Sequence, residues 1–198
     1  MKTITRSILS SVLGLLLVTA CDRVDEGADA MEGSSSTTDQ GPTPEKLFAC
    51  DTGDFTISKP LVGPGFDPAR GGVLGELQPS YVVHTTQLFL DPDRLAEFQA
   101  IADPVSAQLD GTEGLLAYSY AGDQGCGEAS TMAIWASEAA MYRFVGTGAH
   151  AQAMGQANDV GLAGRVTHWT VTGAEANAID WEVARAKIRE VEASGVFY

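Results

Sequence analysis

Three histidines are the residues of this chain best suited to proton chemistry. His84 lies in a β-branched apolar stretch, His168 precedes a tryptophan, and His150 follows the glycine-rich triplet "GTG". An imidazole titrates near neutral pH, so each could withdraw or deliver a proton. The alternative is structural: His150 begins a second helical piece, and the two strand histidines are packed. Their spacing is not that of a zinc site, so the sequence predicts no metal.

Other signatures of chemistry are missing from the sequence. It has no phosphate-binding loop, no dinucleotide-binding glycine pattern, no Gly-x-Ser-x-Gly and no HExxH motif. The chain has 26 acidic and 12 basic residues and a formal net charge of −14. Such a charge disfavours nucleic acids as partners.

The first 20 residues have the features of a secretion signal. Lys2 and Arg6 precede a short apolar core, Ile8 to Ala20. The following "VTAC" resembles the bacterial lipobox, which implies cleavage before Cys21 and lipid on its sulfur. The expected protein is exported and anchored in the lipid bilayer of a bacterial membrane, on the extracytoplasmic side. Residues 21–46 are polar and poor in apolar side chains, as expected of a disordered tether.

Two cysteines remain, Cys50 and Cys126. An exported compartment is oxidising and both residues lie in turn-like sequence, so we expect them to form a disulfide. It would close a loop of about 75 residues and contribute about 4 kcal/mol. A metal or redox pair is the alternative, but no CxxC motif supports it.

The rest of the chain alternates strand and helix patterns. Strands are expected at 81–90, 114–121, 129–136 and 165–172. An apolar helical face runs from Leu95 to Leu109, and Pro104 predicts a kink or break near Asp103. Ser137 begins a second helix, which "GTG" interrupts before it resumes through Met154. Asp180 begins a closing helix, which Gly195 ends.

This order predicts an α+β domain over residues 81–198. It is the ferredoxin-like βαββαβ arrangement, with a four-stranded antiparallel sheet and an added C-terminal helix. Residues 47–80 are rich in Gly and Pro and are expected to be a loop-like arm around the body. On the first strand, His84 should share a face with Val82, Thr86 and Leu88.

The segments "IWASEAAMYRFVGTGAHAQAM" and "RVTHWTVTGAEANAIDWEVA" resemble the antibiotic biosynthesis monooxygenase superfamily, the dimeric α+β barrels. The resemblance implies a homodimer in which two sheets face each other. It also implies either cofactor-independent oxidation of polycyclic aromatics or binding and degradation of heme. The heme-degrading branch has Asn, Trp and His where this chain has Thr85, Phe144 and Met154. No cofactor is therefore predicted, and heme is a secondary alternative.

Two functions follow as hypotheses. The first is a cofactor-independent monooxygenase acting on an aromatic compound, in which His150 or His84 withdraws a proton and His168 is a third candidate. The second is a non-enzymatic module that binds an apolar ligand, heme among them, or a partner protein. A cavity reaching the histidines would favour the enzyme, and an arm across its mouth would favour the binding module. The candidate pocket residues, which could equally be core, are Tyr118, Trp135, Phe144, Trp169 and Thr85.

Overall fold

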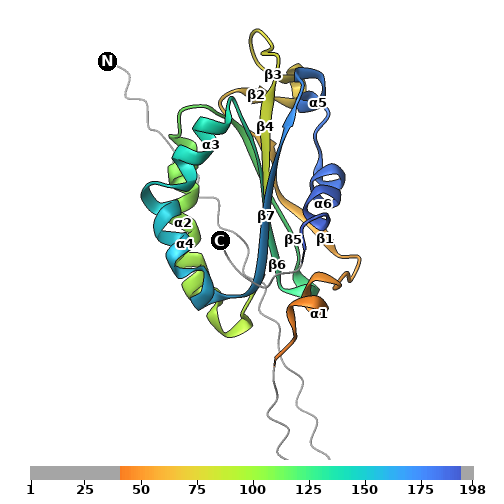
Figure 1. Ribbon diagram of the computed structural model, residues 1–198, viewed down its shortest axis with the longest axis vertical. Helices are drawn as coiled ribbons and strands as arrows, with labels where there is room; N and C mark the ends of the chain where they lie inside the picture. The colour runs from red at the N-terminus through yellow and green to blue at the C-terminus, as the bar shows by residue number, and fades with distance from the viewer. Residues whose placement is uncertain (1–40, 193–198) are drawn as a thin grey trace, which may run out of the picture. The chain divides into compact units, whose positions relative to one another are not determined.

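The computed structural model describes residues 41–192 and contains one five-stranded antiparallel sheet (Figure 1). The strand order is β1-β5-β6-β4-β7. The bounds are β1 Phe55–Val62, β4 Tyr81–Leu90, β5 Leu115–Asp123, β6 Glu128–Trp135 and β7 Gly161–Val171. Without β1, the order and the connecting helices are those of the predicted βαββαβ fold, which is confirmed. The predicted secretion signal, Cys21 and most of the tether lie outside the described residues. The closing helix ends at Arg189, earlier than the predicted end at Gly195.

Helices cover both faces of the sheet (Figure 1). One face, which we call the α4 face, carries α2 (Leu95–Asp110), α3 (Glu138–Val145) and α4 (Gly148–Val160). The opposite face, the α6 face, carries α5 (Gly173–Asn177) and α6 (Trp181–Arg189). Each face has its own apolar core: Val82, Trp135 and Phe144 belong to the first, and Val83, Ile134 and Trp181 to the second.

The helix starts follow the predicted caps. The side chain of Ser137 accepts from the backbone of Ala140, and that of Asp180 accepts from Val183. The predicted break in the first helix is wrong, because α2 continues through Pro104 to Asp110. Pro104 and Ala100 are both exposed, so water can solvate the carbonyl that proline leaves without a donor.

The predicted four-stranded sheet has a fifth strand, β1, and α6 covers the face that the resembled dimer would turn toward its partner. The indole of Trp181 donates to Ser119 (2.8 Å), whose hydroxyl donates to the carbonyl of Lys59 (2.7 Å). This chain of two bonds connects α6 to β5 and β1. Because neither face of the sheet is left uncovered, the fold gives no such support for the predicted homodimer, which stays a prediction.

The arm is more regular than predicted. β1 pairs with β5 as a fifth strand, and β2 (Phe66–Asp67) pairs with β3 (Gly72–Val73). The β-branched and aromatic residues of "FTISKPLV" explain β1, although Gly and Pro dominate the sequence after it.

The predicted disulfide between Cys50 and Cys126 is confirmed. It fixes the short helix α1 (Pro44–Phe48) beside Phe89 and Ala163 on the α6 face. Within residues 41–192, no helix is long and apolar enough to cross a membrane.

Asp123, at the end of β5, provides a test of this part of the fold. Its carboxylate accepts from the hydroxyl (2.5 Å) and backbone N–H (3.0 Å) of Thr52 and from the N–H of Cys126 (3.3 Å). The hydrogen bond from Thr52 lowers the pKa of Asp123 below its ordinary value. Since the folded pKa is depressed, this stabilisation is complete above about pH 4 and is lost as the pH falls through the folded pKa.

We therefore expect Asp123→Asn to lower the free energy of unfolding at neutral pH and to flatten its decline in acid. Urea unfolding measured between neutral pH and pH 3 checks this. Asp93→Asn, at an exposed carboxylate, is the matched control. An acid limb unchanged by Asp123→Asn would contradict the assignment.

Candidate functional site

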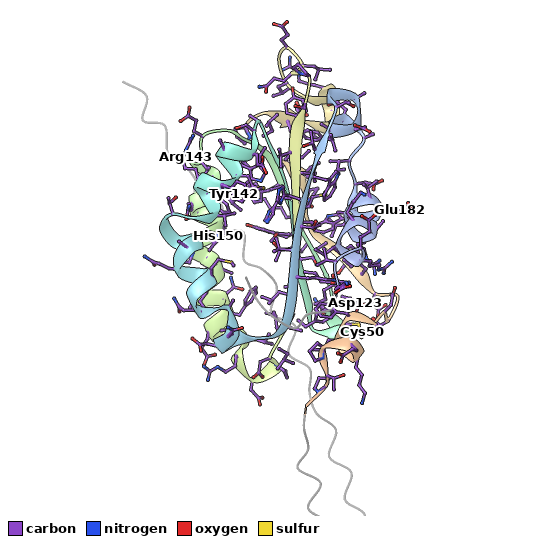
Figure 2. All side chains as sticks on the ribbon, in the orientation of Figure 1. Cys50, Asp123, Tyr142, Arg143, His150 and Glu182 are labelled. Carbon is purple, nitrogen blue, oxygen red and sulfur yellow. A yellow bond between two sulfur atoms is a disulfide. The ribbon has the colours of Figure 1, made fainter. Side chains whose placement is uncertain are left out.

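The sheet register brings the three predicted histidines to one place. His84 on β4 lies directly opposite His168 on β7, and both belong to the α4 face. His150, in the first turn of α4, approaches the same face from the helices (Figure 2). Burial, together with the smaller effects of the charges of His150 and His168, lowers the pKa of His84 to about 4.

His84 is the most buried of the three, with 7% of its surface exposed. Its low pKa keeps it neutral at physiological pH, so its ring offers one N–H donor and one lone pair. No hydrogen bond joins this ring to any other described residue. On the next strand its neighbour is Ala133, which in turn lies opposite Tyr118. The small alanine separates the two larger polar side chains.

The contacts of His150 define its tautomer. Its Nδ1 lies 3.1 Å from the carbonyl oxygen of Val145. A carbonyl can only accept, so Nδ1 carries the hydrogen and Nε2 keeps its lone pair in the neutral ring. Burial lowers the pKa of His150, although the bond to Val145 opposes that shift. The ring packs on Phe144 at 4.6 Å between centroids.

The "GTG" break between α3 and α4 sets the position of His150, and the side chain of Gln108 from α2 stabilises this break. Gln108 accepts from the backbone N–H of His150 (2.9 Å) and donates to the carbonyls of Thr147 (3.1 Å) and Phe144 (3.4 Å). Gly148 has φ +61°, and a Cβ there would lie 2.8 Å from Gln108 Oε1. A glycine is therefore required for the turn and for the approach of Gln108.

His168 is the exposed member of the group. Its Nε2 lies 3.2 Å from the Glu138 carboxylate, and the ring of Tyr142 packs against it at 5.7 Å. Figure 2 shows Tyr142 and His150 on the sheet-facing side of their helices. His168, Glu138 and Tyr142 thus form one polar edge of the site.

Trp135, Phe144 and Tyr118, all predicted pocket residues, lie on the same face. Trp135 packs on Phe144 at 5.2 Å, and its Nε1 is buried without an acceptor. Among the described residues it is the one buried side-chain polar atom without a partner. Tyr118 donates to Asp110 (2.6 Å) and accepts from Lys59. Burial and Asp110 raise the pKa of Tyr118 well above its ordinary value, so it stays protonated.

Two predicted pocket residues lie elsewhere. Thr85 and Trp169 point to the α6 face, because they are one position out of step with His84 and His168. The Thr85 hydroxyl donates to the carbonyl of Thr131 (2.9 Å), and Trp169 packs against the core beneath α6. The structure does not bring them into contact with the histidines.

Beyond His84 on β4, side chains on the α4 face of the sheet are incompletely buried. Thr86 and Leu88 face the helices on the α4 face but are only half-buried, whereas Gln87 and Phe89 on the α6 face are buried. β6 repeats the pattern, since Ala129 and Thr131 are half-buried and Ser130 and Met132 are buried. Solvent therefore reaches this part of the α4 face, and we call the surface formed by Thr86, Leu88, Ala129 and Thr131 the sheet–helix cleft. A shallow groove on the outer side of α2 and α4 contains no histidine.

The chemistry available in the cleft is acid–base chemistry beside an apolar, aromatic wall. Within residues 41–192, no three His, Cys, Asp or Glu side chains are placed to hold a metal ion. The sequence did not single out Gln108, Glu138 or Tyr142. Glu138 and Tyr142 follow a predicted helix cap, but nothing in the sequence indicates that Gln108 reaches the "GTG" turn from another helix.

The comparisons with known proteins give solved structures of similar fold. No protein-family model matches the chain, and no curated protein matches it. A structure from Mycobacterium tuberculosis is 15% identical, covers 46% of this chain and 93% of its own, and has a TM-score of 0.41. One from Bacteroides thetaiotaomicron, provisionally named an antibiotic biosynthesis monooxygenase, is 18% identical over 47% of this chain and 92% of its own, with a TM-score of 0.42.

A Fusobacterium nucleatum structure, provisionally named a monooxygenase, is 11% identical with a TM-score of 0.45. It covers 59% of this chain and 54% of its own, so the present chain spans about half of that protein. At these identities the likeness concerns the fold alone.

The Gln108 contacts lead to a prediction about His150. Gln108→Leu keeps the size of the side chain but removes three hydrogen bonds at the helix break, so the turn should loosen. We expect the Nδ1–H tautomer of His150 to lose its dominance and its pKa to rise toward the ordinary value. Nitrogen-15 NMR of the imidazole rings measures both. Gln99→Leu, on the exposed side of the same helix, is the control, and an unchanged His150 spectrum in Gln108→Leu would contradict the prediction.

Proposed function

We propose that the sheet–helix cleft binds an aromatic ketone or phenol and oxidises it with dioxygen without a cofactor. The observation that carries the proposal is the buried indole N–H of Trp135, which has no acceptor. An unpaired buried donor costs about 1–3 kcal/mol, and phenylalanine at this position would avoid that cost. Trp135 itself is fully buried and packs on Phe144, so a ligand oxygen would supply the missing acceptor once the ring of Phe144 moved aside.

His84 supports the same placement. Trp135 lies opposite Val82, two residues before His84 on the same face of β4, so the two rings are diagonal neighbours. A neutral His84 can donate a second hydrogen bond to the same ligand oxygen without becoming charged. Two such donors would stabilise negative charge that develops on a carbonyl oxygen. The strongly negative chain favours a neutral ligand over an anionic one.

His150 is the base in this proposal, because its Nε2 carries a lone pair beside Phe144. It would remove a proton from a CH2 group activated by the ketone, leaving a carbanion delocalised onto the carbonyl oxygen. The carbanion transfers electrons to dioxygen and forms a peroxide at carbon. Loss of water then gives a new C=O, so that CH2 and O2 become C=O and H2O. One oxygen atom stays on the carbon and the other leaves as water.

The position of the arm supports an enzyme over the binding module. Leu47 and Phe48 pack against Phe89 and Ala163 on the α6 face, where Cys50 is tied to Cys126. The disulfide-fixed start of the arm is therefore on the face opposite the cleft and does not close it. The binding module, with heme among its ligands, remains the second candidate because the same cleft could hold an apolar ligand without reacting.

The test is oxygen consumption by the full chain in detergent, with anthrone as the probe substrate. We expect His150→Gln to reduce the rate by about a hundredfold or more, and Trp135→Phe by a similar factor. Trp181→Phe is the matched control, because its indole N–H already has Ser119 as a partner. It should leave the rate per folded molecule unchanged.

Binding of anthrone is measured in parallel by quenching of tryptophan fluorescence. Binding without oxygen uptake would replace the enzyme by the binding module. Neither binding nor uptake by a panel of anthrones, quinols and heme would overturn both candidates.

We further propose that the protein is an exported lipoprotein. The support is the basic start, the short apolar core and the "VTAC" sequence ending at Cys21. Expressed in a bacterium, the full chain should fractionate with membranes and incorporate labelled fatty acid. Cys21→Ser should abolish the label, whereas Ser34→Ala in the tether should not. A labelled Cys21→Ser protein would contradict the lipid assignment.

A further inference from the structure

The two edges of the sheet differ in how they are protected. β1, at one edge, contains Lys59 and Pro60, and its register with β5 shifts twice. Charged residues, proline and register irregularities are the usual means of preventing edge strands from pairing with other chains. β7, at the other edge, is eleven residues long and has one shift, at its start. Figure 1 shows β7 toward the viewer with no described helix or strand in front of it.

From this contrast we infer that β7 is an interaction surface for a second copy of this chain. Two copies of β7 would pair antiparallel about a twofold axis at Val166 and form a continuous ten-stranded sheet. The inference does not depend on the proposed reaction. It assigns the predicted homodimer to a strand edge, since α6 covers the sheet face that the barrel arrangement would use.

The sequence of β7 is complementary to itself in this register. On the α6 face, Trp169 lies opposite Ala163 of the other copy. On the α4 face, His168 lies opposite Gly164, and Thr170 lies opposite Leu162, whose side chain is 39% exposed. Each large ring therefore faces a small residue. A register shifted by two residues about Thr167 would instead place Trp169 opposite Arg165 and His168 opposite Val166.

Charge also permits this pairing. The chain carries 26 acidic residues, and two copies would repel each other over most of their surfaces. β7 contains none of them. Its one charged residue, Arg165, is buried and donates to Gln87 (2.7 Å), so the strand brings no exposed like charges together.

Helix α4 gives the second half of the surface. Figure 1 shows it in front of α2, on the same side as β7. Ala149 and Ala153 line the groove shared with α2, so Ala151 and Gly155 point away from α2. Both are exposed and uncharged. A twofold axis normal to the sheet keeps both α4 helices on the same side, where small residues let them approach closely.

The arrangement would place two clefts side by side. His168 marks the polar edge of the cleft, and in the dimer Gly164 and Leu162 of the other copy lie next to His168 and Thr170. The second copy would thus form part of the cleft's outer wall.

The test uses the full chain in detergent, with its mass measured by analytical ultracentrifugation. We expect a dimer, and Ala151→Glu should raise its dissociation constant at least tenfold. Ala96→Glu, the same change at an exposed alanine near the start of α2, should not. A monomer at all concentrations, or equal effects of the two variants, would overturn the proposal.

Cross-linking tests the register. Val166→Cys should give a covalent dimer with a short bis-maleimide, because residue 166 faces its own copy at the axis. Thr170→Cys should not, since the two thiols would be eight residues apart along the strands, about 26 Å. The unsubstituted chain controls for Cys21. A dimer that cross-links at 170 and not at 166, or at neither, would place the interface elsewhere.

Discussion

The indole of Trp181 donates to Ser119, and Ser119 donates to the carbonyl of Lys59, so one side chain joins α6 to the two outermost strands on that side of the sheet. Phe55 of β1 packs on the same indole at 5.6 Å. A sheet must bury its apolar faces, and this chain buries the second face beneath its own C-terminal helix. Because the α6 face is covered, the cleft can open only on the α4 face. A partner that bound through the sheet would have to use an edge.

On the α4 face, packing is unequal along the strands. Near Trp135 the helices lie close, with Phe144, Met141 and Leu109 filling the space between α2, α3 and the sheet. Toward Leu88 and Ala129 the same face is half-buried. The break at Gly148 separates the tightly packed part of this face from the half-buried part. Helix α3 packs tightly near Trp135, and α4 continues in a new direction over the half-buried residues. Gln108 fixes that change of direction by bonding to both sides of the break. His150 lies at the boundary, where an apolar wall meets solvent.

The sequence predicts most of the elements because their patterns are long and their caps are explicit. Ser137 and Asp180 begin helices as expected, and the strand at 81–90 has the predicted bounds. β1 was not predicted because its flanks are rich in Gly and Pro, and its strand character depends on pairing with β5, 53 residues beyond its last residue.

The placement of the site residues illustrates the same limit. The alternation of side chains correctly grouped His84 with Val82 and Leu88. The prediction placed Thr85 and Trp169 in the pocket, but successive side chains of a strand point to opposite faces of the sheet. Each of these residues is one position away from a histidine and therefore points to the α6 face. The pairing of His84 with His168 depends on register, and the role of Gln108 depends on helix packing. Neither is encoded in local spacing.

For the same reason, an indole donor without an acceptor can be recognised only when its surroundings are known. Leu or Phe at 135 and Val at 84 would suit a sheet core without leaving polar atoms unpaired, so these two positions carry a cost that packing alone does not explain.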